Sequence, residues 1–160
     1  MEQIKEKDYL NDYLRPFIGK IVIVSPGDLW QQQREKYLYD GNINNQQLRE
    51  VLPNELIIEF DFTAEGKENP DEAKKEATRW HEKTVAIIKT LNIKFHISDH
   101  QGKSPHIRIP IYGLDILPEY TRINYKSRFV HDILQKIRFT PKLICLDESL
   151  IRSKNKLVSL

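Results

Sequence analysis

Three acidic side chains have the type and spacing expected of ligands for a divalent metal ion. Glu59 and Asp61 stand two residues apart in the run IIEFDF, and Asp147 follows the apolar run LICL. Because side chains alternate along a strand, Glu59 and Asp61 are expected to point to one face. Paired carboxylates in an apolar stretch are costly unless a divalent cation compensates their charge, and hard cations take oxygen ligands. The alternatives are a half-exposed strand with a polar face and, for Asp147, a residue that ends a strand or caps a helix.

A second group of polar side chains lies in ISDHQGKSPHIRI, residues 97–109. Gly102 allows the chain to turn tightly and approach a ligand closely. Hydroxyl, ammonium, imidazole and guanidinium groups are all suitable donors to phosphate. The candidate donors of these types in the stretch are Ser98, Lys103, His106 and Arg108. The alternative is an ordinary polar hairpin tip, and His96 and His100 without cysteine partners make a poor zinc site.

The elements that must position these groups can be read from apolar periodicity and turn residues. Helices are expected over 3–18, 42–52, 69–91 and 126–137. Strands are expected over 20–24, 55–62, 94–98, 106–112, 141–151 and 156–160, and 29–39 fits either type. The helix over 69–91 is the clearest, with Pro70 near its start, acidic residues in its first turn, and Trp80 on its apolar stripe.

Length and composition favour one α+β domain with a mostly antiparallel sheet and flanking helices. We expect residues 1–160 to form a single domain, with an N-terminal subdomain over about 1–50 and a core over about 51–160. The net charge is only +2, so a nucleic-acid surface would need its basic groups concentrated on one face. One cysteine excludes a disulfide framework within the chain, and no apolar run is long enough to span a bilayer. These features favour a cytoplasmic protein without a membrane partner, which in a prokaryote would be nucleoid-associated.

The ordered set of motifs resembles the archaeo-eukaryotic primase superfamily over roughly residues 50–160. The first motif of that family is a strand with two acidic residues, here IIEFDF. The second is a Ser, a Gly-Lys turn and a His in a strand, here SDHQGKSPHIRI. The third is an apolar run that ends in Asp before a basic, apolar strand, here LICLDESLIRSKNKLVSL. Glu59 stands where the family usually has Asp, and the chain ends before the segment that usually follows the third motif, so a complete chain and a C-terminal truncation both stay open.

The resemblance implies an RRM-like catalytic core and a DNA primase or primase-polymerase, which is a template-directed nucleotidyltransferase. By this resemblance Glu59, Asp61 and Asp147 would hold two Mg²⁺ or Mn²⁺ ions. The incoming nucleotide would be held by Ser98, Lys103, His106, Arg108, Lys154 and Lys156. The implied partners are a single-stranded DNA template and an NTP or dNTP, with a primase large subunit, a helicase or a ligase as further candidates.

Two other functions compete with the enzyme. The first is a non-catalytic primase-like module that binds nucleic acid in a replication or repair complex, which the Glu59 substitution keeps open. The second is an unrelated metal-dependent nuclease or an α+β domain without this chemistry. The polymerase interpretation requires that the three carboxylates meet beside Ser98 and His106. An Asp147 far from Glu59 and Asp61 would exclude it.

Overall fold

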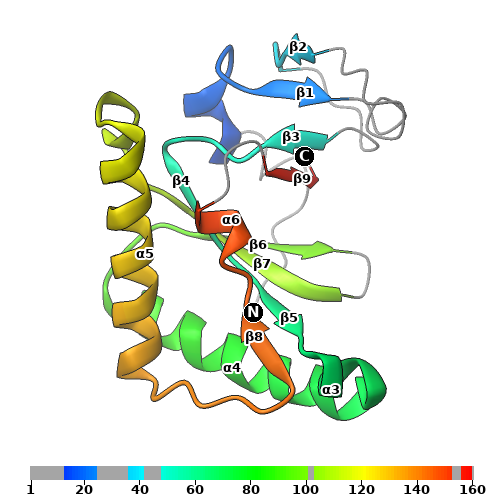
Figure 1. Ribbon diagram of the computed structural model, residues 1–160. Coiled ribbons are helices and arrows are strands. Elements are labelled where there is room, and N and C mark those ends of the chain that lie inside the picture. Colours follow the sequence, from blue (N-terminus) through cyan, green and yellow to red (C-terminus); the bar gives the residue numbers. More distant parts are fainter. Residues whose placement is uncertain (1–12, 25–35, 42–47, 101–102, 153–155, 160) are drawn as a thin grey trace. The chain divides into compact units, whose positions relative to one another are not determined.

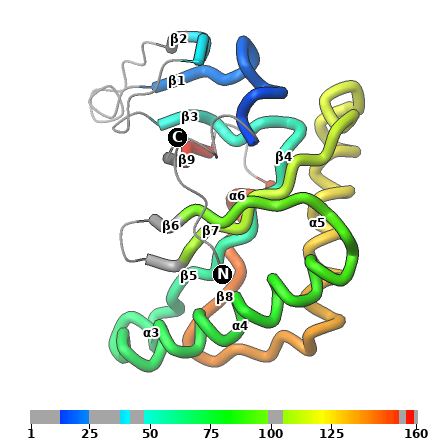
Figure 2. The backbone as a smooth tube through the Cα atoms, turned by 180° about the vertical axis from the view of Figure 1, so that it is seen from behind, coloured from blue at the N-terminus to red at the C-terminus, as the bar shows by residue number. Residues whose placement is uncertain are grey.

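The described part of the chain forms two compact units that are built largely from antiparallel strands. The structure is a computed structural model and describes residues 13–24, 36–41, 48–100, 103–152 and 156–159. One unit comprises residues 1–53 with 154–160, and the other comprises residues 54–153. The described strand pairs are antiparallel, which confirms the expected α+β class (Figures 1 and 2). None of the helices in the described residues is both long and apolar enough to cross a bilayer.

The first unit is a four-stranded sheet in the order β2-β1-β3-β9. Its elements are the 3-10 helix η2 (Arg15–Phe17), β1 (Val22–Val24), β2 (Lys36–Leu38), β3 (Leu48–Glu50) and β9 (Leu157–Ser159). The C-terminal strand β9 pairs with β3, so the two ends of the sequence contribute to one sheet. An apolar cluster that includes Leu14, Phe17 and Ile21 fills the interior of this unit.

One expected helix of the first unit is wrong, and another lies mostly outside the described residues. Residues 48–50 form strand β3 where the sequence favoured a helix over 42–52, because β1 and β9 pair with the segment from both sides. The helical spacing of Leu48, Val51 and Leu52 is therefore overridden by tertiary pairing. Of the helix expected over 3–18, residues 1–12 lie outside the described residues, and residues 13–17 are helical, with a 3-10 turn at Arg15–Phe17.

The second unit holds a three-stranded sheet, a two-stranded sheet and the longer helices. The three-stranded sheet has the order β4-β7-β6, with β4 (Glu55–Ile58), β6 (His96–His100) and β7 (Lys103–Pro110). The two-stranded sheet pairs β5 (Phe60–Phe62) with β8 (Ile144–Leu146). The helices are α3 (Ala64–Glu68), α4 (Pro70–Thr90), η3 (Leu114–Ile116), α5 (Glu119–Lys136) and α6 (Ser149–Arg152).

One expected strand of this unit is divided into two, and another is shorter than expected. The strand expected over 55–62 breaks at Glu59, because β4 pairs with β7 whereas β5 pairs with β8. The strand expected over 141–151 is only β8, and the chain turns into α6 after Asp147. In both cases the backbone changes direction or partner at an acidic residue of the predicted metal site.

Helix α4 confirms the clearest prediction from the sequence. Pro70 stands in its first turn, Asp71 and Glu72 complement the positive helix end, and Asn92 follows its end with a φ of 53°. Its buried face packs on the apolar side of the sheet (Figure 1), and Trp80 meets Phe139 edge to face with ring centroids 5.1 Å apart.

His81 on the buried face of α4 is expected to make the protein sensitive to acid. Its side chain is 3% exposed, and neither ring nitrogen has a hydrogen-bond partner among the described residues. Burial lowers the pKa of His81, and neighbouring Glu82 offsets only part of this effect. Because the unfolded chain keeps the ordinary pKa, the unfolding free energy is expected to fall as the pH falls below about 6.5, by at most about 1.4 kcal/mol per pH unit for this proton.

Replacing His81 by Leu is expected to stabilise the protein and to reduce this acid sensitivity. The change removes two buried polar atoms without partners, which together cost about 1–3 kcal/mol. Urea unfolding at pH 7.5 and pH 5.5 measures both effects, with His131→Leu on the exposed side of α5 as a control. An equal loss of stability between the two pH values in His81→Leu and the parent would contradict the prediction.

Candidate metal and nucleotide site

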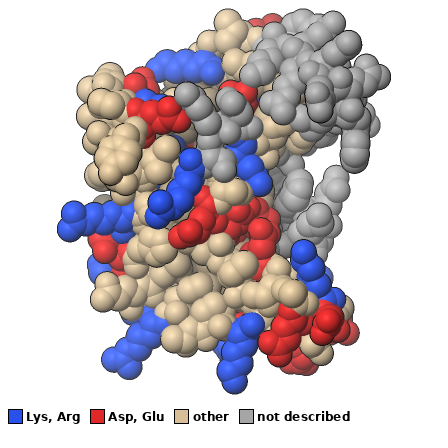
Figure 3. All heavy atoms as spheres, in the orientation of Figure 1, with Lys and Arg blue, Asp and Glu red and all other residues tan. Residues whose placement is uncertain are grey.

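The three predicted acidic residues lie together in the second unit. One carboxylate oxygen from each of Glu59, Asp61 and Asp147 lies within 4.8 Å of the other two. Asp61 is exposed, and Glu59 and Asp147 are partly buried. In Figure 3 acidic side chains gather in the middle of the face, over α6 and the adjacent end of β8. The distant sequence positions therefore converge, as the polymerase interpretation requires.

Strand pairing brings these residues together. Asp61 pairs with Cys145 and Phe60 with Leu146 in the β5-β8 ladder. The ladder extends by one step, because the Asp147 N–H donates to the Glu59 carbonyl at 2.9 Å. Phe60 is buried and stacks on Phe139 with ring centroids 5.1 Å apart, which anchors the inward side of β5. Alternation along the strand then directs the neighbouring carboxylates to the opposite side.

Asp147 also caps the short helix that follows it. Its Oδ1 accepts hydrogen bonds from the Ser149 backbone N–H and from the Ser149 hydroxyl. The cap that the sequence offered as an alternative is thus present, and it coexists with membership of the acidic cluster. These two donors fix the orientation of the Asp147 carboxylate towards the cluster.

His106 connects the nucleotide-binding stretch to the carboxylates. Its Nε2 lies 2.9 Å from Glu59 Oε2, and the two side chains are 5% and 13% exposed. Ser98 is directly opposite His106 in the β6-β7 ladder, and paired residues of an antiparallel ladder share one face. Ser98 Oγ is buried and has no hydrogen-bond partner among the described residues. A hydroxyl donor and an imidazole therefore stand on the same sheet face, beside Glu59.

The same sheet face carries a second polar pair. His96 is opposite Arg108, and both side chains are buried. Burial lowers the pKa of His96 to about 4, with a smaller contribution from the positive charge of Arg108. His96 is therefore neutral at neutral pH. The other face of this hairpin is apolar, and its Ile107 and Ile109 belong to the core.

Cys145 is a member of this neighbourhood that the sequence did not single out. Its register partner is Asp61, and its side chain is exposed. Partial desolvation of the thiol raises the pKa of Cys145, and the negative charges of Asp61 and Asp147 raise it further. The alternation of side chains on β8 could have predicted this position, because Cys145 precedes Asp147 by two residues.

The other residues predicted to bind the nucleotide lie in different parts of the structure or outside the described residues. Arg108 is buried on the face that also carries Ser98 and His106. The Lys103 side chain and all of Lys154 lie outside the described residues. Lys156 belongs to the first unit, where its carbonyl accepts a hydrogen bond from the Val51 N–H. The structure thus brings together the carboxylates, Ser98, His106 and Arg108.

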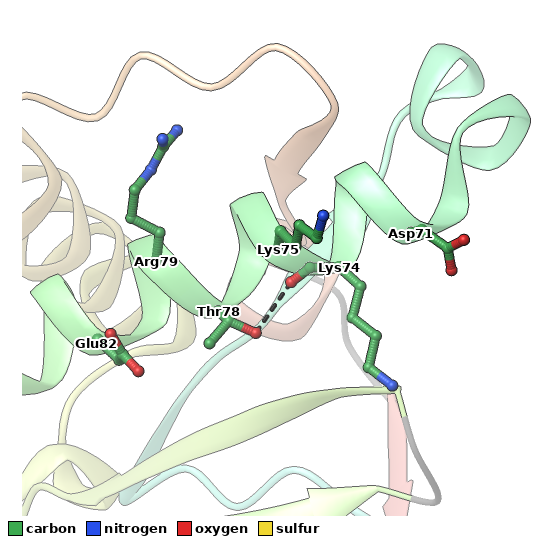
Figure 4. A pocket seen from close by; sticks show the side chains of 6 residues that line it. All are labelled: Asp71, Lys74, Lys75, Thr78, Arg79 and Glu82. Carbon is green, nitrogen blue, oxygen red and sulfur yellow. Dashed lines mark hydrogen bonds between the residues drawn. The ribbon is translucent and has the colours of Figure 1, made fainter.

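A separate hollow runs along the outer side of α4 (Figure 4). Its described lining is Asp71, Lys74, Lys75, Thr78, Arg79 and Glu82. The lining contains both acidic and basic side chains, and the Thr78 hydroxyl donates back to the Lys74 carbonyl within the helix. No described residue of this lining belongs to the carboxylate cluster, so the cluster remains the stronger candidate for chemistry.

Comparisons of this chain with protein-family models, with curated proteins and with solved structures found no match.

Proposed function

We propose that the chain is a nucleotidyltransferase of the DNA primase or primase-polymerase type, with the RRM-like core that the motif order implies. The observation that carries the proposal is the meeting of Glu59, Asp61 and Asp147 within 4.8 Å, with His106 Nε2 2.9 Å from Glu59. The same order of motifs in the sequence supports it independently. The expected partners are a single-stranded DNA template and an NTP or dNTP.

The donor set suits Mg²⁺ or Mn²⁺, which prefer carboxylate oxygen ligands. Carboxylates this close repel one another by roughly 1 kcal/mol per pair in water and by about 3–4 kcal/mol at the effective dielectric of a protein surface. A bound divalent cation would reverse this repulsion, activate the attacking 3′-hydroxyl and neutralise charge on the leaving group. Glu59, Asp61 and Asp147 would hold the metal.

The side chains of the sheet face would position the nucleotide. The 3′-oxygen forms a bond to the α-phosphorus and loses its proton, while the bond from that phosphorus to the bridging oxygen breaks and releases pyrophosphate. Such in-line transfer needs mainly positioning and electrostatic stabilisation from the protein. Ser98 Oγ–H and the His106 imidazole would donate to triphosphate oxygens. A phosphate oxygen would satisfy the Ser98 hydroxyl, which has no partner within the described part of the chain.

Manganese-dependent incorporation of labelled nucleotide on a single-stranded template tests this function. Template-dependent elongation that requires Mn²⁺ or Mg²⁺ is the expected result. Binding of DNA without product would instead support a non-catalytic module, and a shortened template would indicate a nuclease. Either result contradicts the proposal.

Replacing His106 by Ala is expected to weaken nucleotide binding by about tenfold or more, since hydrogen bonds to charged groups contribute about 1.5–3 kcal/mol. Affinity for the DNA template should change much less. Fluorescence titrations with a labelled nucleotide in Ca²⁺, which avoids turnover, and with labelled DNA measure the two constants. An unchanged nucleotide dissociation constant would remove His106 from the triphosphate site.

A further inference from the structure

The segment that leads into β8 is held by a single side chain from α4. Glu76 Oε1 accepts hydrogen bonds from the backbone N–H of Lys142 at 2.6 Å and of Leu143 at 3.0 Å. Both bonds join residues that are more than sixty positions apart in the sequence. One carboxylate oxygen therefore satisfies two consecutive backbone donors immediately before the strand that ends at Asp147.

A second contact holds the same segment from the side of β5. The Thr63 N–H donates to the Leu143 carbonyl at 2.9 Å, and Phe62 pairs with Ile144 in the ladder that follows. Leu143 is thus bound through its N–H to α4 and through its carbonyl to the chain after β5. Since β8 is only three residues long, this double attachment sets the register in which Asp147 reaches Glu59.

We infer that Glu76 is a positioning residue of the carboxylate cluster, an inference that rests on the proposed metal-dependent function. Glu76 does not belong to the cluster itself. It acts through the backbone of Lys142 and Leu143, which places β8 and hence Asp147. Groups that orient metal ligands typically change metal affinity by about 10–100-fold when removed, and we expect about tenfold because Glu76 acts at four residues' distance from Asp147.

Two conservative variants separate this role from a simple charge effect. Glu76→Gln keeps a side-chain oxygen at the same reach and loses the charge, so it is expected to bind Mn²⁺ like the parent. Glu76→Asp keeps the charge and is one methylene shorter, so it is expected to bind Mn²⁺ about tenfold more weakly. Long-range attraction between Glu76 and the cation would produce the opposite order.

Isothermal titration with Mn²⁺ of the full chain measures these affinities, and thermal unfolding reports whether each variant is folded. Glu72→Gln and Glu72→Asp are matched controls, because Glu72 lies one turn earlier on α4, where it pairs with Lys75 on the surface. Equal affinity of Glu76→Asp and the parent would overturn the inference and leave the proposed function intact. Absence of Mn²⁺ binding by the parent would overturn the proposed function and this inference with it.

Discussion

Replacing Asp61 by Asn is expected to reduce metal-dependent nucleotide incorporation by at least about a hundredfold and to leave the chain folded. A metal ion contributes several kcal/mol of transition-state stabilisation, and each 1.36 kcal/mol corresponds to a tenfold change in rate. Asn retains one oxygen but loses the negative charge and one ligand atom. Asp61 is the exposed member of the cluster, whereas Asp147 also caps α6 and Glu59 also contacts His106.

The same substitution is expected to maintain or slightly raise stability, by up to about 1 kcal/mol, because it relieves repulsion between close carboxylates and Asp61 is exposed to solvent. Opposite effects on activity and stability would distinguish a functional carboxylate from a structural one. Primer extension in Mn²⁺ and urea unfolding without metal are the two measurements, with Asp132→Asn on the exposed side of α5 as the control. Extension at the parental rate by Asp61→Asn would exclude the metal assignment.

Local pattern predicted the parts of the fold that local physics determines. Helix α4 follows from Pro70, the acidic first turn and one apolar stripe, all of which act within a few residues. Strand β3 could not be predicted in this way, because its partners β1 and β9 lie far away in the sequence and impose an extended backbone on Leu48–Glu50. The break of the expected strand 55–62 at Glu59 could not be predicted from local pattern either, because it depends on the pairing of β5 with β8.

The candidate site shows the same division between local and long-range information. Residue type and order were sufficient to select Glu59, Asp61, Asp147 and His106, and their convergence confirms that expectation of proximity. The contact between His106 and Glu59 could not be predicted, because it depends on the register of β4 against β7. No sequence motif marks Glu76, because its partners are two backbone N–H groups that come near it only in the folded chain.

A substitution of Gly66 in α3 is expected to have a large effect on the stability of the protein. A Cβ at this position would overlap the Leu143 carbonyl oxygen, and it would also come within 3.3 Å of the Ala73 Cβ. The helix approaches so closely because the Thr63 hydroxyl accepts from the Gly66 N–H while the Thr63 N–H donates to that same Leu143 carbonyl. Only a residue without a side chain fits between α3 and the segment that Glu76 holds.

Replacing Gly66 by Ala is therefore expected to destabilise the protein by about 1–3 kcal/mol. In an exposed helix the same change would stabilise by about 1 kcal/mol through helix propensity. Here overpacking against backbone costs about 1–3 kcal/mol or more, and loss of the bond to Leu143 adds about 1 kcal/mol, so the clash outweighs propensity. Urea unfolding of Gly66→Ala measures the effect, with Lys67→Ala at the exposed neighbouring position as the control. Because displacement of Leu143 also displaces Asp147, Gly66→Ala should weaken Mn²⁺ binding as well, and a variant as stable as the parent would show that α3 does not lie against this segment.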